Sequence, residues 1–144
     1  MNLKDVAARG ITGFHHALVR VSGGRVGGRL VGMPVVILET TGRKSGQVRR
    51  TMLTAPVVDG DTVVLVASYG GDDRHPQWYL NLVAQPDVAI ELGGVRRAMR
   101  ARVATAEEKA ALWPRITKAY RGYAAYQKRT DRDIPVVLLT PRTA

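Results

Sequence analysis

A short basic segment is the first part of the chain whose residue types could bind a ligand. Residues 40–47 read Thr-Thr-Gly-Arg-Lys-Ser-Gly-Gln, and they are followed by Arg49, Arg50 and Thr51. Gly42 and Gly46 allow a tight turn that directs backbone N–H groups outward. Guanidinium, ammonium and hydroxyl groups around such a turn suit the oxygens of a phosphate. The alternative is a solvated hairpin tip, because basic residues are common at such tips.

A second candidate segment combines a glycine pair with aromatic side chains. Residues 67–71 read Ala-Ser-Tyr-Gly-Gly, and residues 75–81 read His-Pro-Gln-Trp-Tyr-Leu-Asn. A strand end, two glycines and a helix start together expose backbone donors. Trp78 and Tyr79 would offer flat surfaces to a ring system, and the Asn81 amide could fix its orientation. The alternative is a core tryptophan beside a capping loop.

Three tyrosines form the third candidate: Tyr120, Tyr123 and Tyr126. A step of three residues drifts by only about 60° around a helix, so the three rings share one face. Tyrosines at the mouth of a pocket can stack on a substrate and donate a hydrogen bond or a proton. The alternative is an aromatic stripe in the core.

The sequence offers little for metal or nucleophilic chemistry. It contains no Cys, which excludes thiolate metal sites and cysteine nucleophiles. His15 and His16 are adjacent, so on a helix they point about 100° apart and do not form a metal-binding pair. Ser68 lacks the flanking glycines of a nucleophile elbow. We therefore expect no metal, and we expect any chemistry to come from a bound cofactor that the protein orients.

The elements that must position these residues are strands and helices in alternation. β-Branched and alternating stretches predict strands at residues 34–41, 49–58, 62–68, 87–92, 95–104 and 134–139. Helices are expected at residues 5–20, from Pro76 to residue 84, and from the capping box Thr105–Glu108 past Gly122. Tight turns join most strand pairs, so the predicted fold class is α+β with about six mainly antiparallel strands. Such a sheet tends to close into a barrel because closure hides its edges.

The formal net charge of +10, from 22 Lys and Arg against 12 Asp and Glu, indicates an anionic partner. A competing function is therefore a small basic nucleic-acid-binding domain. Its support is one predicted strand that carries Arg96, Arg97, Arg100 and Arg102. These four residues fall on both faces of that strand, and the aromatic residues cluster in helices and loops, so we expect no nucleic acid.

The N-terminal region gives an indication of where in the cell the protein is located. No apolar run approaches the roughly 18–20 residues of a membrane span, and the first ten residues lack the apolar stretch of a signal peptide. A cytoplasmic location is therefore expected. Residues 1–21 could still form a weak basic amphipathic helix with peripheral membrane contact. The alternative is a helix packed on the domain.

Taken in order, these segments resemble the deazaflavin-dependent nitroreductase family of actinobacteria. The resemblance is carried by Thr41–Gly46, Arg49–Thr51, Ser68–Gly71, His75–Tyr79 with Asn81, Leu82 and Pro86, and Tyr123–Tyr126 ahead of Ile134 and Pro135. It implies a split β-barrel like those that bind FMN, formed by residues 29–144, with residues 1–28 as an N-terminal helix and glycine-rich linker. It also implies coenzyme F-420, an 8-hydroxy-5-deazaflavin with a phosphodiester and an oligoglutamate tail.

The resemblance further implies a role for each candidate residue. The residues beside the phosphate and tail would be Lys44, Ser45, Gln47, Arg49, Arg50 and Thr51. Those around the deazaflavin would be Val66, Ala67, Ser68, Trp78, Tyr79, Asn81 and Tyr123. The catalytic residues on the acceptor side would be Tyr120, Tyr123, Tyr126 and Ser68. The implied reaction is hydride transfer from the reduced coenzyme to a small electron-poor acceptor such as a quinone or a nitroaromatic.

One position departs from the family pattern. Tyr69 stands where several relatives carry a basic or polar residue, so the affinity for the tail or the shape of the pocket mouth would differ. An FMN- or haem-binding relative of the same barrel is the remaining alternative. Barrel relatives are often dimers, although members of this family need not be, so the sequence leaves both a monomer and a homodimer open.

Overall fold

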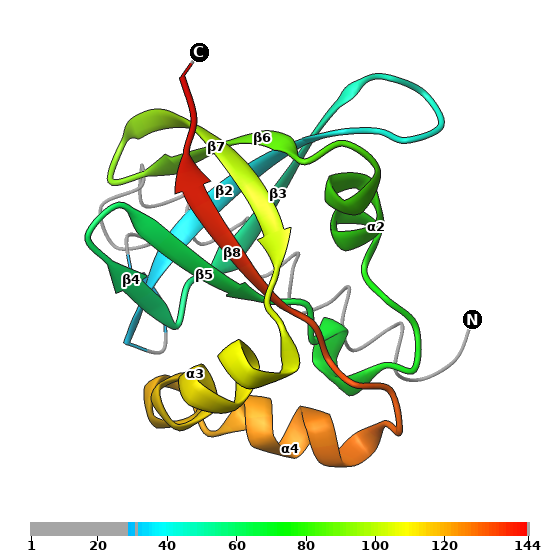
Figure 1. Ribbon diagram of the computed structural model, residues 1–144, viewed down its shortest axis with the longest axis vertical. Helices are drawn as coiled ribbons and strands as arrows, with labels where there is room; N and C mark the ends of the chain where they lie inside the picture. Colours follow the sequence, from blue (N-terminus) through cyan, green and yellow to red (C-terminus); the bar gives the residue numbers. More distant parts are fainter. Residues whose placement is uncertain (1–28, 31, 144) are drawn as a thin grey trace.

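The computed structural model describes residues 29, 30 and 32–143 (Figure 1). The helix expected at residues 5–20 and the glycine-rich linker lie outside these residues. The described strands are β1 (Arg29–Leu30), β2 (Met33–Thr41), β3 (Val48–Thr54), β4 (Val57–Asp59), β5 (Thr62–Val66), β6 (Asp87–Leu92), β7 (Val95–Val103) and β8 (Val136–Pro141). The described helices are the short 3-10 helix η2 (Tyr69–Gly71), α2 (Gln77–Ala84), α3 (Ala106–Ala119) and α4 (Gly122–Arg129).

The strands form one strongly curled antiparallel sheet. Their order is β1-β2-β6-β7-β8-β5-β4, and β3 pairs with β2 outside this path. Each ladder is antiparallel. Within the described part of the chain no ladder joins β3 to β4, so the barrel stays split between these strands. The expected α+β class with a mainly antiparallel split barrel is confirmed.

Two hydrophobic clusters share the central strands. On β5, Val63 and Leu65 point into the barrel, where Trp78 and Leu82 of α2 meet them. The alternate residue Val64 faces the second cluster, which contains Ile116 of α3 and Tyr123 of α4. Because side chains alternate along a strand, a strand buried on both faces serves both clusters. Helix α2 therefore covers the barrel near the turn between β2 and β3, and α3 and α4 cover another face (Figure 1).

The prediction of one strand over residues 49–58 is wrong in one respect, because that strand is broken. β3 ends at Thr54 and β4 begins at Val57. Pro56 has no backbone N–H to donate to a ladder. The N–H of Ala55 instead bonds the carbonyl of Pro34 at 3.0 Å, which closes the end of the β2–β3 pairing. This break and the two-residue β1 raise the strand count above the six expected.

A capping box begins α3, as the sequence predicts. The Thr105 hydroxyl accepts a hydrogen bond from the Glu108 N–H, and the Glu108 carboxylate accepts one from the Thr105 N–H. Arg102 also donates two hydrogen bonds to the Glu108 carboxylate, at 2.6 and 2.9 Å. Together these bonds, led by those from Arg102, lower the pKa of Glu108 to about 2.

None of the helices in the described residues combines the length and the apolar character that a membrane crossing requires. The peripheral contact expected through residues 1–21 lies outside the described part of the chain.

Replacing the cap of α3 tests this local account. Thr105→Ala removes the acceptor for the Glu108 N–H, so the free energy of unfolding should fall by about 1 kcal/mol. Urea titration monitored by circular dichroism measures the change. The matched control is Thr117→Ala, because the Thr117 hydroxyl bonds only carbonyls of its own helix. Equal losses in the two variants would contradict the capping role.

Candidate functional site

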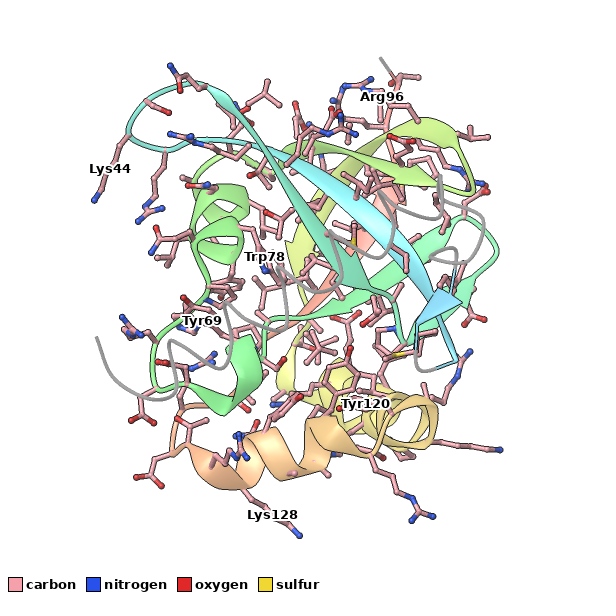
Figure 2. All side chains as sticks on the ribbon, turned by 180° about the vertical axis from the view of Figure 1, so that it is seen from behind. Lys44, Tyr69, Trp78, Arg96, Tyr120 and Lys128 are labelled. Atoms are coloured by element: carbon pink, nitrogen blue, oxygen red, sulfur yellow. The ribbon has the colours of Figure 1, made fainter. Side chains whose placement is uncertain are left out.

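The basic turn between β2 and β3 is attached to helix α2. We call residues 42–49 the cationic turn. The backbone N–H of Arg43 and its Nη1 donate to Asn81 Oδ1 at 3.2 and 2.9 Å, and its Nη2 donates to Gln77 Oε1 at 2.9 Å. Figure 2 shows that Lys44 on this turn and Trp78 on α2 lie on the same side of the molecule. The first two candidate segments therefore form one continuous region.

The internal bonds of the cationic turn give it a defined shape. The N–H of Gly42 donates to the carbonyl of Gln47 at 2.7 Å, and the Ser45 hydroxyl accepts from the N–H of Gln47 at 3.1 Å. A Cβ at Gly42 would lie 2.6 Å from the Ser45 hydroxyl and 3.3 Å from the carbonyl oxygen of Gln47, so a side chain there would displace the Ser45 hydroxyl. Gly46 has a φ of +72°, which also favours glycine. The phosphate-binding arrangement inferred from the sequence thus has a matching backbone.

The side chains of the cationic turn are exposed and positively charged. Arg43 is bonded to neutral amides, and no ion pair to Lys44 or Arg49 is formed among the described residues. The hydroxyl of Thr40, which is only 2% exposed, has no hydrogen-bond partner there. A cationic surface without carboxylates, next to an unsatisfied buried hydroxyl, fits an anionic ligand better than a solvated tip.

Arg50 is separated from this surface by strand alternation. Arg49 and Thr51 share a face of the sheet with their partners Thr40 and Leu38, whereas Arg50 lies on the other face. There Arg50 donates to the Glu91 carboxylate at 2.9 Å and lies 3.7 Å from Glu39. The structure therefore brings Arg49 and Thr51 together with the cationic turn, but it does not bring the charge of Arg50 there.

Helix α2 presents its aromatic residues differently from the expectation. Trp78 is only 7% exposed and packs in the barrel core, which corresponds to the alternative of a core tryptophan. Tyr79 is half-buried, with its ring centroid 4.7 Å from that of His75. Asn81 is buried, and its amide oxygen is used by Arg43. Trp78 and Asn81 are thus buried beneath the surface of the site, and Asn81 fixes the cationic turn through its bond with Arg43.

The loop that follows β5 adopts an unusual backbone. We call residues 67–75 the post-β5 loop. Tyr69, Gly70 and Gly71 have φ values of +46°, +64° and +83°. A Cβ at Gly71 would lie 2.9 Å from Arg129 Cδ and 3.0 Å from the carbonyl oxygen of Tyr126, so this glycine permits close packing on α4. Val66 and Ala67, on either side of the strand end, point into different clusters.

Arg132 holds this loop in place, and the sequence analysis missed it. Its guanidinium donates to the backbone carbonyls of Ala67, Ser68 and Asp72 and contacts His75 Nδ1, at distances between 2.9 and 3.2 Å. Burial, and then the nearby guanidinium, lower the pKa of His75. The acceptors are mostly backbone groups, so no pattern of side chains in the sequence could have indicated this contact.

The three tyrosines gather into one cluster, which we call the tyrosine cluster. Their ring centroids lie 5.3 to 6.3 Å apart, and the hydroxyls of Tyr120 and Tyr126 are 3.4 Å apart. Tyr123 is only 6% exposed and belongs to the second hydrophobic cluster, and its hydroxyl lies 3.3 Å from the Thr54 hydroxyl and 3.8 Å from Met33 Sδ. An added Cβ at Gly122 would overlap the Tyr120 ring, so glycine allows this ring to fold back over α4.

Burial raises the pKa of the Tyr123 and Tyr126 hydroxyls and so keeps them protonated. It is the main cause that raises the pKa of Tyr123, and it raises that of Tyr126 to about 12 with help from the neighbouring Tyr120 hydroxyl. A phenol that stays protonated at neutral pH can donate a hydrogen bond to an oxygen that gains negative charge. The cluster therefore suits the stabilisation of charge on a bound acceptor.

These parts follow one another along one side of the molecule. Figure 2 shows Lys44, Trp78, Tyr69 and Tyr120 in this order, from the cationic turn past α2 to the helices at the opposite end. The contacts of Arg43 with Asn81, and of Gly71 with α4, join the neighbouring parts directly. Groups of His, Asp and Glu that could hold a metal ion are absent from the described residues.

Three of the four arginines on the β7 strand are neutralised. Arg96 pairs with Glu39, Arg100 with Asp87 and Arg102 with Glu108, each at 3.0 Å or less. This strand therefore presents less free positive charge than its sequence indicates. The cationic turn keeps more of its charge.

Comparisons with known proteins show the family of this chain. A family model described as "F420H(2)-dependent quinone reductase" matches residues 12–141. An F420H(2)-dependent quinone reductase of Mycobacterium tuberculosis is 44% identical over 133 residues, which cover 90% of this chain and 89% of the relative.

Two solved structures are also similar to this chain. One, described as an F420-H2 dependent reductase, is 40% identical with a TM-score of 0.67, covering 74% of this chain and 93% of its own. The other, described as a domain-swapped dimer, is 36% identical with a TM-score of 0.68, covering 86% and 98%. The chain with this cationic turn and tyrosine cluster belongs to the F420H(2)-dependent quinone reductase family.

Proposed function

We propose that this protein transfers a hydride from reduced coenzyme F-420 to a quinone, between the cationic turn and the tyrosine cluster. The observation that carries the proposal is the attachment of a carboxylate-free cationic turn to α2, in line with a loop and a cluster of protonated phenols. A ligand with one anionic end and one flat redox end matches that order of groups. Membership of the family supports the same coenzyme.

The anionic end of the coenzyme would lie at the cationic turn. Lys44 and Arg49 supply charge, and Ser45 and Gln47 supply polar groups. The unsatisfied Thr40 hydroxyl is a further donor beside Arg49. Asn81 contributes through Arg43 because its amide oxygen is already bonded to that residue. Thr51 lies on the same face of β3 as Arg49. Arg50 is already paired with carboxylates, so it is less suited to bind the anionic end of the coenzyme.

The redox end would lie between the post-β5 loop and the tyrosine cluster. When bound, the reduced deazaflavin supplies a hydride. Ala67 and Ser68 bound the region on one side, with the core ring of Trp78 behind them. Hydroxyls from Ser68 and from Tyr120, Tyr123 or Tyr126 would hold the acceptor oxygen and stabilise its growing charge. The aromatic rings of the tyrosine cluster pack against one another beside these hydroxyls.

A binding and turnover assay tests this proposal. The purified protein is titrated with oxidised coenzyme F-420, FMN and haem while their spectra are followed, and then mixed with reduced coenzyme F-420 and menadione. We expect micromolar binding of the deazaflavin, no binding of FMN or haem, and oxidation of the reduced coenzyme that depends on menadione. Binding of haem or FMN alone would support the alternative barrel functions. A nitroaromatic in place of menadione measures the breadth of the acceptor range.

A nucleic-acid function is tested in the same way with a labelled random oligonucleotide. Binding of the oligonucleotide that weakens with salt, without any binding of the coenzyme, would contradict the proposal.

We also propose that the protein forms a homodimer and makes a peripheral membrane contact. A solved relative is described as a domain-swapped dimer, and we extend dimer formation to this chain. Sedimentation equilibrium measures the mass. Co-sedimentation of the full chain with anionic lipid vesicles tests the proposed contact through residues 1–21.

Charge removal at the cationic turn should weaken coenzyme binding. Lys44→Ala and Arg49→Ala should each raise the Kd about tenfold, since each removes a charge-assisted hydrogen bond to the anion. The affinity should also depend less on salt concentration. The matched control is Lys118→Ala, an exposed cation on α3, which should change Kd less than twofold. Three equal Kd values would contradict the location of the anionic end.

Removal of one phenol hydroxyl should slow turnover. Tyr123→Phe keeps the buried ring and loses the hydroxyl beside Thr54, so kcat should fall about tenfold or more while the Kd of the coenzyme stays within twofold. Stopped-flow oxidation of the reduced coenzyme by menadione measures the rate. A weaker affinity with an unchanged kcat would instead assign Tyr123 to coenzyme binding.

The raised pKa values predict the alkaline limb of the activity. Tyr126, with a pKa of about 12, and Tyr123, whose pKa is also raised, remain protonated up to at least about pH 10. The rate with menadione should therefore show no loss from phenol ionisation between pH 7 and about 10. A fall of the rate centred near pH 8 in folded protein would contradict the role of these phenols as donors.

A further inference from the structure

The two sides of the proposed site are carried by segments that are far apart in the sequence. The post-β5 loop follows one strand, and the tyrosine cluster lies around α4, more than 40 residues later. Transfer between two bound molecules is sensitive to their separation, and a displacement of about 1 Å can reduce the rate about 100-fold. Some contact must therefore hold the loop and the helix in a fixed relation.

Arg132 makes most of the contacts that do this, beside the single bond that Arg129 Nη1 of α4 donates to the carbonyl of Gly70 at 3.2 Å. Arg132 Nη1 donates to the carbonyl of Ala67 at 3.2 Å, and its Nη2 donates to the carbonyls of Ser68 and Asp72 at 3.1 and 2.9 Å. Nε donates again to Asp72 at 3.2 Å, and Nη1 also contacts His75 Nδ1 at 3.1 Å. One guanidinium thus binds both ends of the segment that carries Tyr69, Gly70 and Gly71.

The backbone of Arg132 is anchored to α4. Its N–H donates to the Thr130 hydroxyl at 3.2 Å, and its carbonyl accepts from Gln127 Nε2 at 2.7 Å. The other amide atom of Gln127 accepts from Lys109 of α3 and from the N–H of Ile134. The guanidinium therefore transmits the position of α4 to the post-β5 loop.

Arg132 binds the backbone carbonyls of the loop and does not bind the Asp72 carboxylate. The Asp72 carboxylate is bonded to Arg74, while Arg132 binds the carbonyl of Asp72. Between the carbonyls that Arg132 holds lies Tyr69, whose φ of +46° is strained for a residue with a side chain. The fork of donors keeps the loop in this conformation, which a single-donor side chain cannot do.

We infer that Arg132 is a positioning residue that fixes the Ala67–Ser68 backbone relative to the tyrosine cluster, so that donor and acceptor meet at the reacting distance. This inference rests on the proposed function. Arg132 touches neither reactant, and its effect passes through the loop.

The test compares Arg132→Lys with the control Arg115→Lys. Arg115 makes a bidentate pair with Asp59, away from the post-β5 loop, so the control makes the same chemical change elsewhere. Three quantities are measured: amide hydrogen exchange of residues 67–75 in the coenzyme-free protein, the Kd of oxidised coenzyme F-420, and the single-turnover rate with reduced coenzyme and menadione.

For Arg132→Lys we expect amide exchange in residues 67–75 to accelerate at least tenfold, because the N–H groups of Gly71 and Asp72 bond within this loop. The single-turnover rate should fall at least tenfold, whereas Kd should rise no more than about threefold because the cationic turn still holds the anionic end. Arg115→Lys should leave all three within twofold of the wild type. A rate and an exchange pattern like those of the wild type would overturn the inference.

A second variant covers the case in which Arg132→Lys does not fold. Thr130→Val keeps the shape of a buried side chain and removes the acceptor for the Arg132 N–H, so it should shift exchange and rate in the same direction by a smaller factor. No shift in either quantity would overturn the inference. Wild-type protein that neither binds nor oxidises the coenzyme overturns the proposed function. Wild-type activity together with an unchanged rate in the variants overturns the positioning role alone.

Discussion

The bond between Arg43 and the Asn81 amide oxygen is the contact on which the candidate site depends. It converts a hairpin tip, which would otherwise move in solvent, into part of the surface of α2. Helix α2 is in turn fixed because Trp78 and Leu82 are buried in the barrel. The position of the positive charge is therefore set by the hydrophobic core, through one buried amide. A flexible basic turn would attract anions without orienting them.

The opposite end of the site depends on polar contacts to the backbone. The post-β5 loop packs on α4 through a glycine that has no room for a side chain, and a guanidinium holds its carbonyls. The barrel strand β5 leads directly into this loop. A change in the packing of α3 and α4 can therefore reach the loop through the strand, through Arg132, and through Arg129, which donates to the Gly70 carbonyl.

Much of this architecture could be predicted from the sequence. Alternating β-branched residues identify most of the strands, Thr105 and Glu108 identify the start of α3, and the spacing of three tyrosines identifies a shared face. These features are local, so a short window of sequence contains the relevant information. The break after Thr54 has a local signal in Pro56, whereas the bond of Ala55 to the carbonyl of Pro34 depends on the pairing with β2, which local patterns do not reveal.

The differences between the expected and the observed positions of the candidate site residues have a similar cause. From residue type alone, Arg49 and Arg50 are both predicted to lie beside the phosphate. Neighbouring residues on a strand, however, point to opposite faces. Trp78 and Asn81 are chemically suited to a ligand, but the core and Arg43 already use them. The role of Arg132 could not be predicted from the sequence, because Arg132 binds peptide carbonyls, which every residue possesses.

The missing side chain at Gly122 has a consequence for the evolution of this enzyme. The ring of Tyr120 rests where a methyl group would otherwise be, so the tilt of that phenol is coupled to a backbone position that reaches no ligand itself. A larger residue at this position would move the Tyr120 ring, while the cationic turn would stay unaltered. The tyrosine cluster of such reductases can then change in evolution without a change in the cationic turn.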